Sequence, residues 1–137
     1  MANKSWAEKF GAAKEAEIKL VPTDMVGMKE GEKMLLPTPQ LIDDFVRSIP
    51  PGQSVDTKEM RRALAASQNA EVTCPIVTGI HLRTVAEVAY ERHQMGAPLS
   101  DVTPFWRVVR ARQPLAKKLS CGISFVAKQR ESEGLEA

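Results

Sequence analysis

The sequence predicts one mainly helical domain with a small β-hairpin, arranged as a winged helix-turn-helix. Two observations predict this fold class. Amphipathic helical segments follow one another closely between residues 38 and 98, and a short aromatic and β-branched segment comes directly after them. The resulting order of three helices, a hairpin and a final helix is the outline of a winged helix-turn-helix.

The composition suits one globular core. The chain has 137 residues, of which 43% are hydrophobic and 26% are charged. These values exclude a disordered chain, a collagen-like fibre and a coiled coil. No window approaches the roughly 18 consecutive apolar residues of a membrane span, and charged side chains interrupt the N-terminus where a signal peptide needs an apolar stretch. We therefore expect a cytoplasmic protein with no membrane partner.

The cysteine and histidine content predicts no metal site. The chain has two cysteines, Cys74 and Cys121, and two histidines, and none of them stand at a close metal-binding spacing. A glycine-rich phosphate loop, a carboxylate pair and a Ser-His-Asp set are also missing from the sequence. We therefore expect no metal, no cofactor and no independent enzyme activity. So few cysteines also suit a reducing compartment.

The chain divides into an arm and a domain. Residues 1–36 form the arm, which opens with a short helix over 5–17, capped by Ser5. Residues 21–33 contain a proline and two glycines among alternating charges, a pattern that predicts a linker with little capacity to enter a core. Residues 37–137 form the winged-helix domain.

The first two helices of the domain have recognisable start signals. Thr38 is placed as the N-cap of a helix that begins at Pro39 and ends before a Pro-Pro-Gly turn, with Asp43 on its exposed face. Asp56 is placed as the N-cap of the second helix, and a glutamate three residues later completes a capping box. The two helices are short and closely spaced, as the motif requires.

The third helix, from about Pro75 to Gln94, is the expected recognition helix of the motif. Its apolar residues share one face, and Arg83, Glu87 and Glu91 share the opposite one. This spacing predicts an exposed ion pair between Arg83 and Glu87, one turn apart.

The remainder of the chain predicts a hairpin and a closing helix. Residues 103–115 carry an aromatic and β-branched run followed by turn residues, which favours two short strands. Residues 124–133 then predict an amphipathic helix with Phe125 and Val126 turned inward. Gly134 is placed to end that helix as its C-terminal glycine.

Three stretches, in order along the chain, carry a resemblance to a known family. They read Phe45-Val-Arg-Ser-Ile-Pro-Pro-Gly-Gln-Ser-Val-Asp-Thr57, then Thr103-Pro-Phe-Trp-Arg-Val-Val109, then Cys121-Gly122 with Glu133-Gly134-Leu135. They resemble a helix ending in Ile-Pro-x-Gly, the signature Pro-Cys-His-Arg-Val-Val, and a Gly-Gly turn with a closing helix that ends in Glu-Gly. These are motifs of the alkylguanine-DNA alkyltransferases and their alkyltransferase-like relatives. The resemblance covers about residues 38–135 and implies a fold like that family's C-terminal domain.

The resemblance implies a catalytically dead relative. Where the signature has cysteine and histidine, this sequence has Phe105 and Trp106, which can neither accept an alkyl group nor act as a general base. Pro104 and these two rings are then the remnant of a base pocket, and the rings either stack on a base or pack in the core. Thr57 stands near the place of the family's nucleotide-rotating tyrosine. Chemistry at Cys74, beside a helix N-terminus, is a residual alternative to a buried structural thiol.

The basic residues predict where nucleic acid would bind. Between residues 102 and 130 there are seven basic residues and no acidic one, and the second helix adds a basic edge. The resemblance also makes Arg83 a candidate to enter the base stack. We expect non-enzymatic binding of double-stranded DNA, with recognition of alkylated bases implied by the resemblance alone. A protein-interaction scaffold with a solvated basic surface and a protein partner is the alternative. The predicted DNA-binding residues are Thr57, Lys58, Arg61, Arg62, Arg83, Arg107, Arg110 and Arg112.

Overall fold

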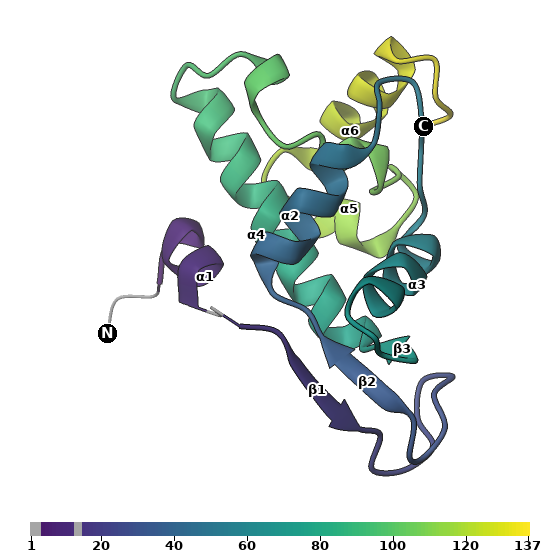
Figure 1. Ribbon diagram of the computed structural model, residues 1–137. Helices are drawn as coiled ribbons and strands as arrows, with labels where there is room; N and C mark the ends of the chain where they lie inside the picture. Colours follow the sequence, from purple (N-terminus) through teal and green to yellow (C-terminus); the bar gives the residue numbers. More distant parts are fainter. Residues whose placement is uncertain (1–3, 13–14) are drawn as a thin grey trace.

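The computed structural model describes residues 4–12 and 15–137, and within them the chain forms six α-helices and a three-stranded sheet (Figure 1). The mainly helical class with a small sheet is therefore confirmed. Two 3-10 turns cover Leu99–Asp101 and Phe105–Arg107. The helices are α1 (Trp6–Ala12), α2 (Pro39–Ser48), α3 (Thr57–Ser67), α4 (Pro75–Gln94), α5 (Pro114–Lys118) and α6 (Gly122–Ser132), and the strands are β1 (Glu17–Leu20), β2 (Lys33–Leu36) and β3 (Val72–Thr73).

The core gathers around α4, the longest helix of the described chain. Helices α1 and α2 both pack against α4 (Figure 1). Five core side chains, each at most 1% exposed, come from five different elements: Leu35, Ile42, Met60, Val85 and Val126. Burial of such side chains is the main stabilising contribution to a domain of this size. This packing fixes the inner face of α4 and leaves the outer face of its N-terminal half free for other roles.

The helix boundaries follow the capping residues that the sequence predicts. The Thr38 hydroxyl accepts a hydrogen bond from the Leu41 N–H at 3.1 Å, and the Asp56 carboxylate accepts one from the Glu59 N–H at 2.8 Å. Gly134 ends α6 in the left-handed conformation, with φ at 78°. The three predicted caps are therefore confirmed. Caps of this kind set helix boundaries because they satisfy backbone groups that a helix end leaves without partners.

The N-terminal helix is shorter than predicted. Ser5 and Glu8 form a reciprocal capping box, in which each side chain accepts the other residue's N–H at 3.1 Å. Helix α1 ends at Ala12, residues 13 and 14 lie outside the described residues, and Glu17 already begins β1. The predicted start is confirmed, whereas the predicted helical state of residue 17 is wrong.

The predicted hairpin over residues 103–115 is wrong. The structure has a 3-10 turn over Phe105–Arg107 and the short helix α5 in its place. Every residue from Val102 to Val109 except Arg107 is buried, so the run has no polar side to face solvent. The N–H groups of Val108 and Val109 both donate to the Phe105 carbonyl rather than to a neighbouring strand. A continuous apolar run does not distinguish a strand from a buried turn.

The small β-hairpin lies in the arm instead. β1 pairs with β2 in antiparallel fashion, and β2 pairs with β3 in parallel (Figure 1). Val21 and Met28, in the segment between β1 and β2, are buried in a second apolar cluster with Met34 and Cys74. The expectation that residues 21–33 have little core capacity is therefore wrong. Glycine and proline there shape a folded turn that places apolar side chains on the sheet.

Two carboxylates that were expected on exposed helix faces are buried. Asp43 is 8% exposed and accepts hydrogen bonds from the Thr103 hydroxyl and from Arg47 Nε. Glu87 is 2% exposed and accepts bonds from the N–H and hydroxyl of Ser120. Helical spacing alone misplaced both, because Thr103 and Ser120, the hydroxyl partners of the two carboxylates, lie far away in the sequence.

The described helices include none with the length and apolar character needed to span a membrane.

Candidate nucleic-acid interface

The N-terminal half of α4 presents an apolar stripe to solvent. Ile76 and Ile80, one turn apart on this helix, are 54% and 59% exposed, whereas Val85 and Ala86 further along are 1% exposed. Exposed apolar surface flanked by polar groups is typical of an interaction site. The outer face of α4 is therefore the first candidate for a functional surface.

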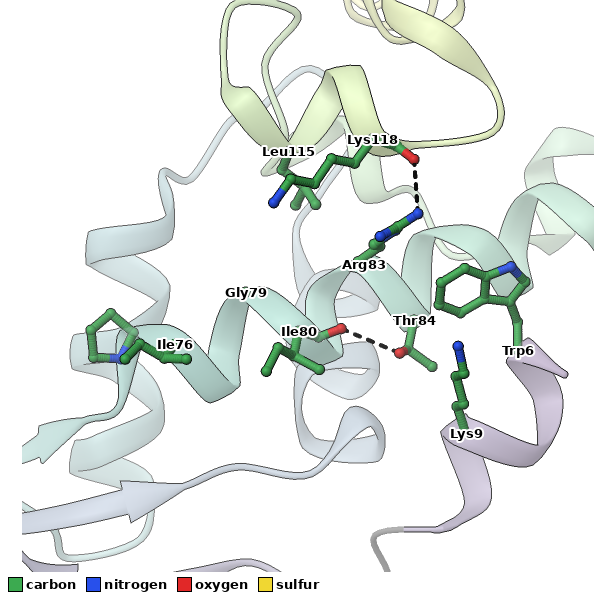
Figure 2. A pocket seen from close by; sticks show the side chains of 10 residues that line it. Trp6, Lys9, Ile76, Gly79, Ile80, Arg83, Thr84, Leu115 and Lys118 are labelled. Atoms are coloured by element: carbon green, nitrogen blue, oxygen red, sulfur yellow. Dashed lines mark hydrogen bonds between the residues drawn. The ribbon is translucent and has the colours of Figure 1, made fainter. Parts of the chain in front are cut away.

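Two adjoining pockets flank this stripe. The larger pocket, of about 580 Å³, lies between α4, α1 and α5 (Figure 2), and the smaller, of about 240 Å³, lies between α4, α3 and α5. Their walls share Pro75, Gly79 and Leu115. We call the two together the α4 groove. The larger pocket has a volume in the range of small-ligand sites, roughly 300–1,000 Å³.

The basic edge of α3 borders the groove. Lys58 and Arg62 are exposed, and Arg61 is half-buried and lines the smaller pocket together with Thr57. On its other side Arg61 joins Lys58 and Arg62 in a further pocket of about 260 Å³, which also contains Glu71. The structure thus brings four of the predicted DNA-binding residues together along one helix.

Arg110 and Arg112 extend this basic edge. Arg110 is exposed and lies close enough to Asp56, the N-cap of α3, to act on its charge. The Glu59 N–H, and more weakly the charge of Arg110, lower the pKa of Asp56 below its usual value. Arg112 is exposed two residues later. Within the described residues no carboxylate forms an ion pair with a basic residue of α3 or with Arg110 or Arg112.

Arg83 lies in the larger pocket and has an incomplete set of partners. Its Nε stands 3.9 Å from the Glu87 carboxylate, so the predicted pair is present, but Glu87 is buried rather than exposed. Its Nη2 donates to the Lys118 carbonyl at 3.2 Å (Figure 2). Its Nε is buried and makes no hydrogen bond within the described chain. An unsatisfied buried donor is costly. A ligand in the pocket can reach only the accessible part of this side chain, which is 39% exposed as a whole.

Arg107 points into the protein rather than toward solvent. Its side chain is 14% exposed, its Nε donates to the Glu133 carboxylate at 2.9 Å, and its Nη1 donates to the Ile49 carbonyl at 2.8 Å. The Arg107 guanidinium thus joins two segments that lie far apart in the sequence, at Ile49 and Glu133. We therefore leave Arg107 out of the DNA-contact set, and Arg130, which is 1% exposed, belongs to the interior as well.

The base-pocket remnant is filled by its own side chains. Phe105 and Trp106 are 1% and 4% exposed and meet edge to face with their ring centroids 5.3 Å apart. Trp106 Nε1 also donates to the Glu133 carboxylate at 2.6 Å. Pro104 and Trp106 line a small cavity of about 170 Å³ together with Arg107. Of the two interpretations of these rings, core packing matches their burial, and neither ring offers an open face to a base.

Sequence reasoning missed two residues of the α4 groove, Trp6 and Gly79. The Trp6 ring on α1 lies 4.3 Å from Lys9 Nζ and 5.1 Å from Arg83 Cζ, measured to the ring centroid. Gly79 sits inside a long helix, where glycine costs about 0.5–1 kcal/mol relative to alanine. A glycine inside a predicted helix could therefore have marked Gly79 from the sequence alone. No sequence signal placed Trp6 beside α4, because α1 belongs to the arm.

The two cysteines lie outside this groove. Cys74 is 6% exposed and belongs to the second apolar cluster. Burial, followed by the charge of Glu87, raises the pKa of Cys121 to about 11. At neutral pH Cys121 is therefore protonated and a poor nucleophile. The described residues contain no group of three or more side chains suited to hold a metal ion.

Comparisons with protein-family models, with curated proteins and with solved structures gave no significant match, so the family resemblance rests on the sequence motifs alone.

Proposed function

We propose that this protein binds double-stranded DNA without catalysing a reaction on it. In this proposal α3 and α4 act as the two helices of a helix-turn-helix, without the predicted wing, and the outer face of α4 enters the major groove. The cations of α3, with Arg110 and Arg112 along the same edge, contact phosphates beside that groove. The exposed isoleucines of α4 then meet base edges, where methyl groups offer apolar contacts.

One observation carries the proposal: unpaired cations border a groove whose walls hold no carboxylate among the described residues. A solvated surface of ordinary composition mixes both signs of charge. Acidic residues do lie near the α3 edge, because Glu71 shares a pocket with its cations and Asp56 lies near Arg110, but none lines the α4 groove within the described residues. A groove of one charge sign attracts a polyanion.

The proposal is tested by fluorescence anisotropy of a labelled duplex at two salt concentrations, about 50 and about 200 mM. We expect affinity to fall steeply with salt, and Arg62→Ala to reduce the salt slope by about 1. Arg92→Ala is the matched control, because Arg92 is an exposed arginine in the last turn of α4, away from the groove. Salt-insensitive binding, or equal losses in the two variants, would contradict the proposal.

Preference for alkylated guanine is a separate question for the same assay. The family resemblance implies it, whereas the buried Phe105 and Trp106 rings give a base no open stacking surface. We therefore propose general duplex binding and expect equal affinity for a duplex with and without an alkylguanine. A preference for the alkylated duplex would restore the lesion-sensor interpretation.

A protein partner is the second candidate, favoured by the exposure of Ile76 and Ile80. An amphipathic helix laid on this stripe would bury both side chains. The two candidates separate cleanly in the Ile80→Ser variant, which removes apolar area but no charge. A protein scaffold loses its partner in this variant, while the salt-dependent part of duplex binding is unchanged.

A further inference from the structure

The larger pocket of the α4 groove has the chemistry of a small-ligand site. Three cations from three helices, Lys9, Arg83 and Lys118, stand around it, and no acidic residue of the described chain contributes to its wall. Figure 2 shows the Trp6 ring and the Arg83 guanidinium on the same side of the pocket, with Lys9 below the ring. Three cations in a wall without a carboxylate give this pocket a positive charge, which suits an anionic group such as a phosphate monoester.

Gly79 supplies an independent sign that a ligand enters this pocket. A Cβ built on Gly79 would meet no atom within 4 Å, and its backbone is not in the left-handed conformation. Neither packing nor backbone geometry therefore requires glycine at this helical position. Glycine in a helix is destabilising relative to alanine, and a site where a ligand approaches the backbone closely is one reason for its presence. The space above Gly79 is the pocket itself (Figure 2).

The Trp6 ring gives the pocket one aromatic wall. Trp6 is half-buried, and Lys9 and Arg83 lie within cation–π distance of its ring. Ile80 and Leu115 line the pocket as apolar surfaces. An aromatic ring, apolar walls and adjacent cations together suit a flat, π-bearing body attached to an anionic group.

We propose that this pocket binds a nucleoside phosphate, with the base against Trp6 and above Gly79 and with the phosphate on Arg83, Lys9 and Lys118. The Arg83 side chain lines the pocket and is 39% exposed, so its accessible part can donate to a phosphate oxygen. The same ligand chemistry comes from two sources, a free nucleotide or the phosphorylated end of a DNA strand. Only the second source rests on the proposed DNA binding.

The two tryptophans of the chain allow a direct test. In the Trp106→Phe variant, Trp6 is the only tryptophan and reports on the pocket by its fluorescence. We expect saturable quenching by dAMP, and at least about tenfold weaker quenching by adenosine, which lacks the phosphate. A blunt duplex without terminal phosphates, compared with a duplex carrying a 5′-phosphorylated overhang, tests the strand-end source.

Two variants fix the location of the ligand. Gly79→Leu fills the pocket without removing any native contact, and Arg83→Ala removes a cation. Each is expected to weaken dAMP binding about tenfold or more, while Arg92→Ala on the same helix leaves it unchanged. Absence of quenching by both dAMP and the overhang duplex, or dAMP binding that persists at full strength in Gly79→Leu, overturns the proposal.

Parallel anisotropy with the labelled blunt duplex separates this inference from the proposed function. Binding of the blunt duplex, with no response of Trp6 to either dAMP or the overhang duplex, leaves the proposed function intact and overturns the pocket. Quenching by dAMP without binding of the duplex supports the pocket and overturns the proposed function. The Trp6→Phe variant, in which only the buried Trp106 fluoresces, must show no quenching by dAMP, because otherwise the signal does not come from the pocket.

Discussion

Single side chains with partners far along the chain hold the second half of the protein together. The Glu133 carboxylate accepts hydrogen bonds from Trp106 Nε1 at 2.6 Å, from Arg107 Nε at 2.9 Å and from the Gly52 N–H at 2.9 Å. The Arg130 guanidinium donates to the Trp106 carbonyl and to the Ser54 hydroxyl. Together these bonds tie the end of α6 to the 3-10 turn and to the loop before α3.

Glu133 makes the stability of the protein depend on acid pH. Burial alone would raise the pKa of Glu133, but hydrogen bonds from Arg107, Trp106 and Gly52 outweigh it and hold this pKa below the ordinary 4.5. The stabilisation is therefore complete above about pH 4.5 and is lost as the pH falls through the lower, folded-state pKa. Glu133→Gln should lower the free energy of unfolding at pH 7 by roughly 1–3 kcal/mol.

Urea denaturation at pH 7 and at about pH 3 checks this prediction. The difference between Glu133→Gln and the native chain should shrink at the lower pH, because the stabilisation from the ionised carboxylate declines once the pH falls below the ordinary pKa of 4.5. Glu131→Gln, at an exposed position in the last turn of α6, is the control and should change little at either pH. A constant difference at both pH values would show that Glu133 acts through its shape rather than its charge.

The sequence predicted which single residues lie on the surface where helix periodicity was clear, but it did not predict contacts between residues far apart in the chain. The basic residues of α3 lie on the surface as predicted, because helix periodicity and a clear N-cap at Asp56 fix which side faces solvent. Arg107 looked like a phosphate contact and is engaged with Glu133, which lies 26 residues away. Nothing in the local sequence of an arginine states whether a distant carboxylate will meet it. Trp6 was missed for the same reason.

Secondary structure elements with local signals were predictable, and those defined by tertiary packing were not. Helices α2, α3 and α4 begin where Thr38, Asp56 and Pro75 predict, since caps act within one turn. The prediction of a hairpin over residues 103–115 was wrong because the apolar run in this segment is buried on all sides. The strands of the arm were not predicted, because β2 pairs in parallel with β3, and two helices separate these strands in the sequence.

Gly79 is expected to make helix α4 less stable than the same helix with alanine at this position. Because a Cβ on Gly79 meets no atom within 4 Å, Gly79→Ala should raise the free energy of unfolding by about 0.5–1 kcal/mol. Urea denaturation of the variant and of the native chain measures the difference. A destabilised variant would indicate that the fold itself needs glycine here, which would remove one support of the nucleotide pocket.

The whole molecule depends on its arm. Leu35 on β2 is fully buried in the main core, and the Leu35 carbonyl accepts the Cys74 N–H at the start of α4. A fragment of residues 37–137 should therefore be less stable than the full chain by at least roughly 3 kcal/mol, the cost typical of losing one buried leucine. A fragment of residues 15–137, which keeps the sheet, is the control and should lose much less.

Chemical denaturation of the two fragments measures this dependence. Equal stability of the 37–137 fragment and the full chain would show that residues 1–36 are an appendage after all. The outcome bears on function too, since the larger pocket takes Trp6 and Lys9 from this arm. The sequence did not predict this dependence, because a four-residue strand beside glycine-rich turns carries little periodic signal.

The parallel pairing of β2 with β3 also predicts an order of events in folding. The backbone N–H of Lys33 donates to the Glu71 carboxylate, 38 residues away, and we expect this edge of the sheet to close only after α2 and α3 have come together. Non-local closure of this kind is slow relative to helix formation. Thr73→Ala in β3 should therefore accelerate unfolding and leave the refolding rate nearly unchanged, whereas Ile42→Val in α2 should slow refolding. Stopped-flow chevrons of both variants would reveal the opposite order if the slowed refolding belonged to Thr73→Ala.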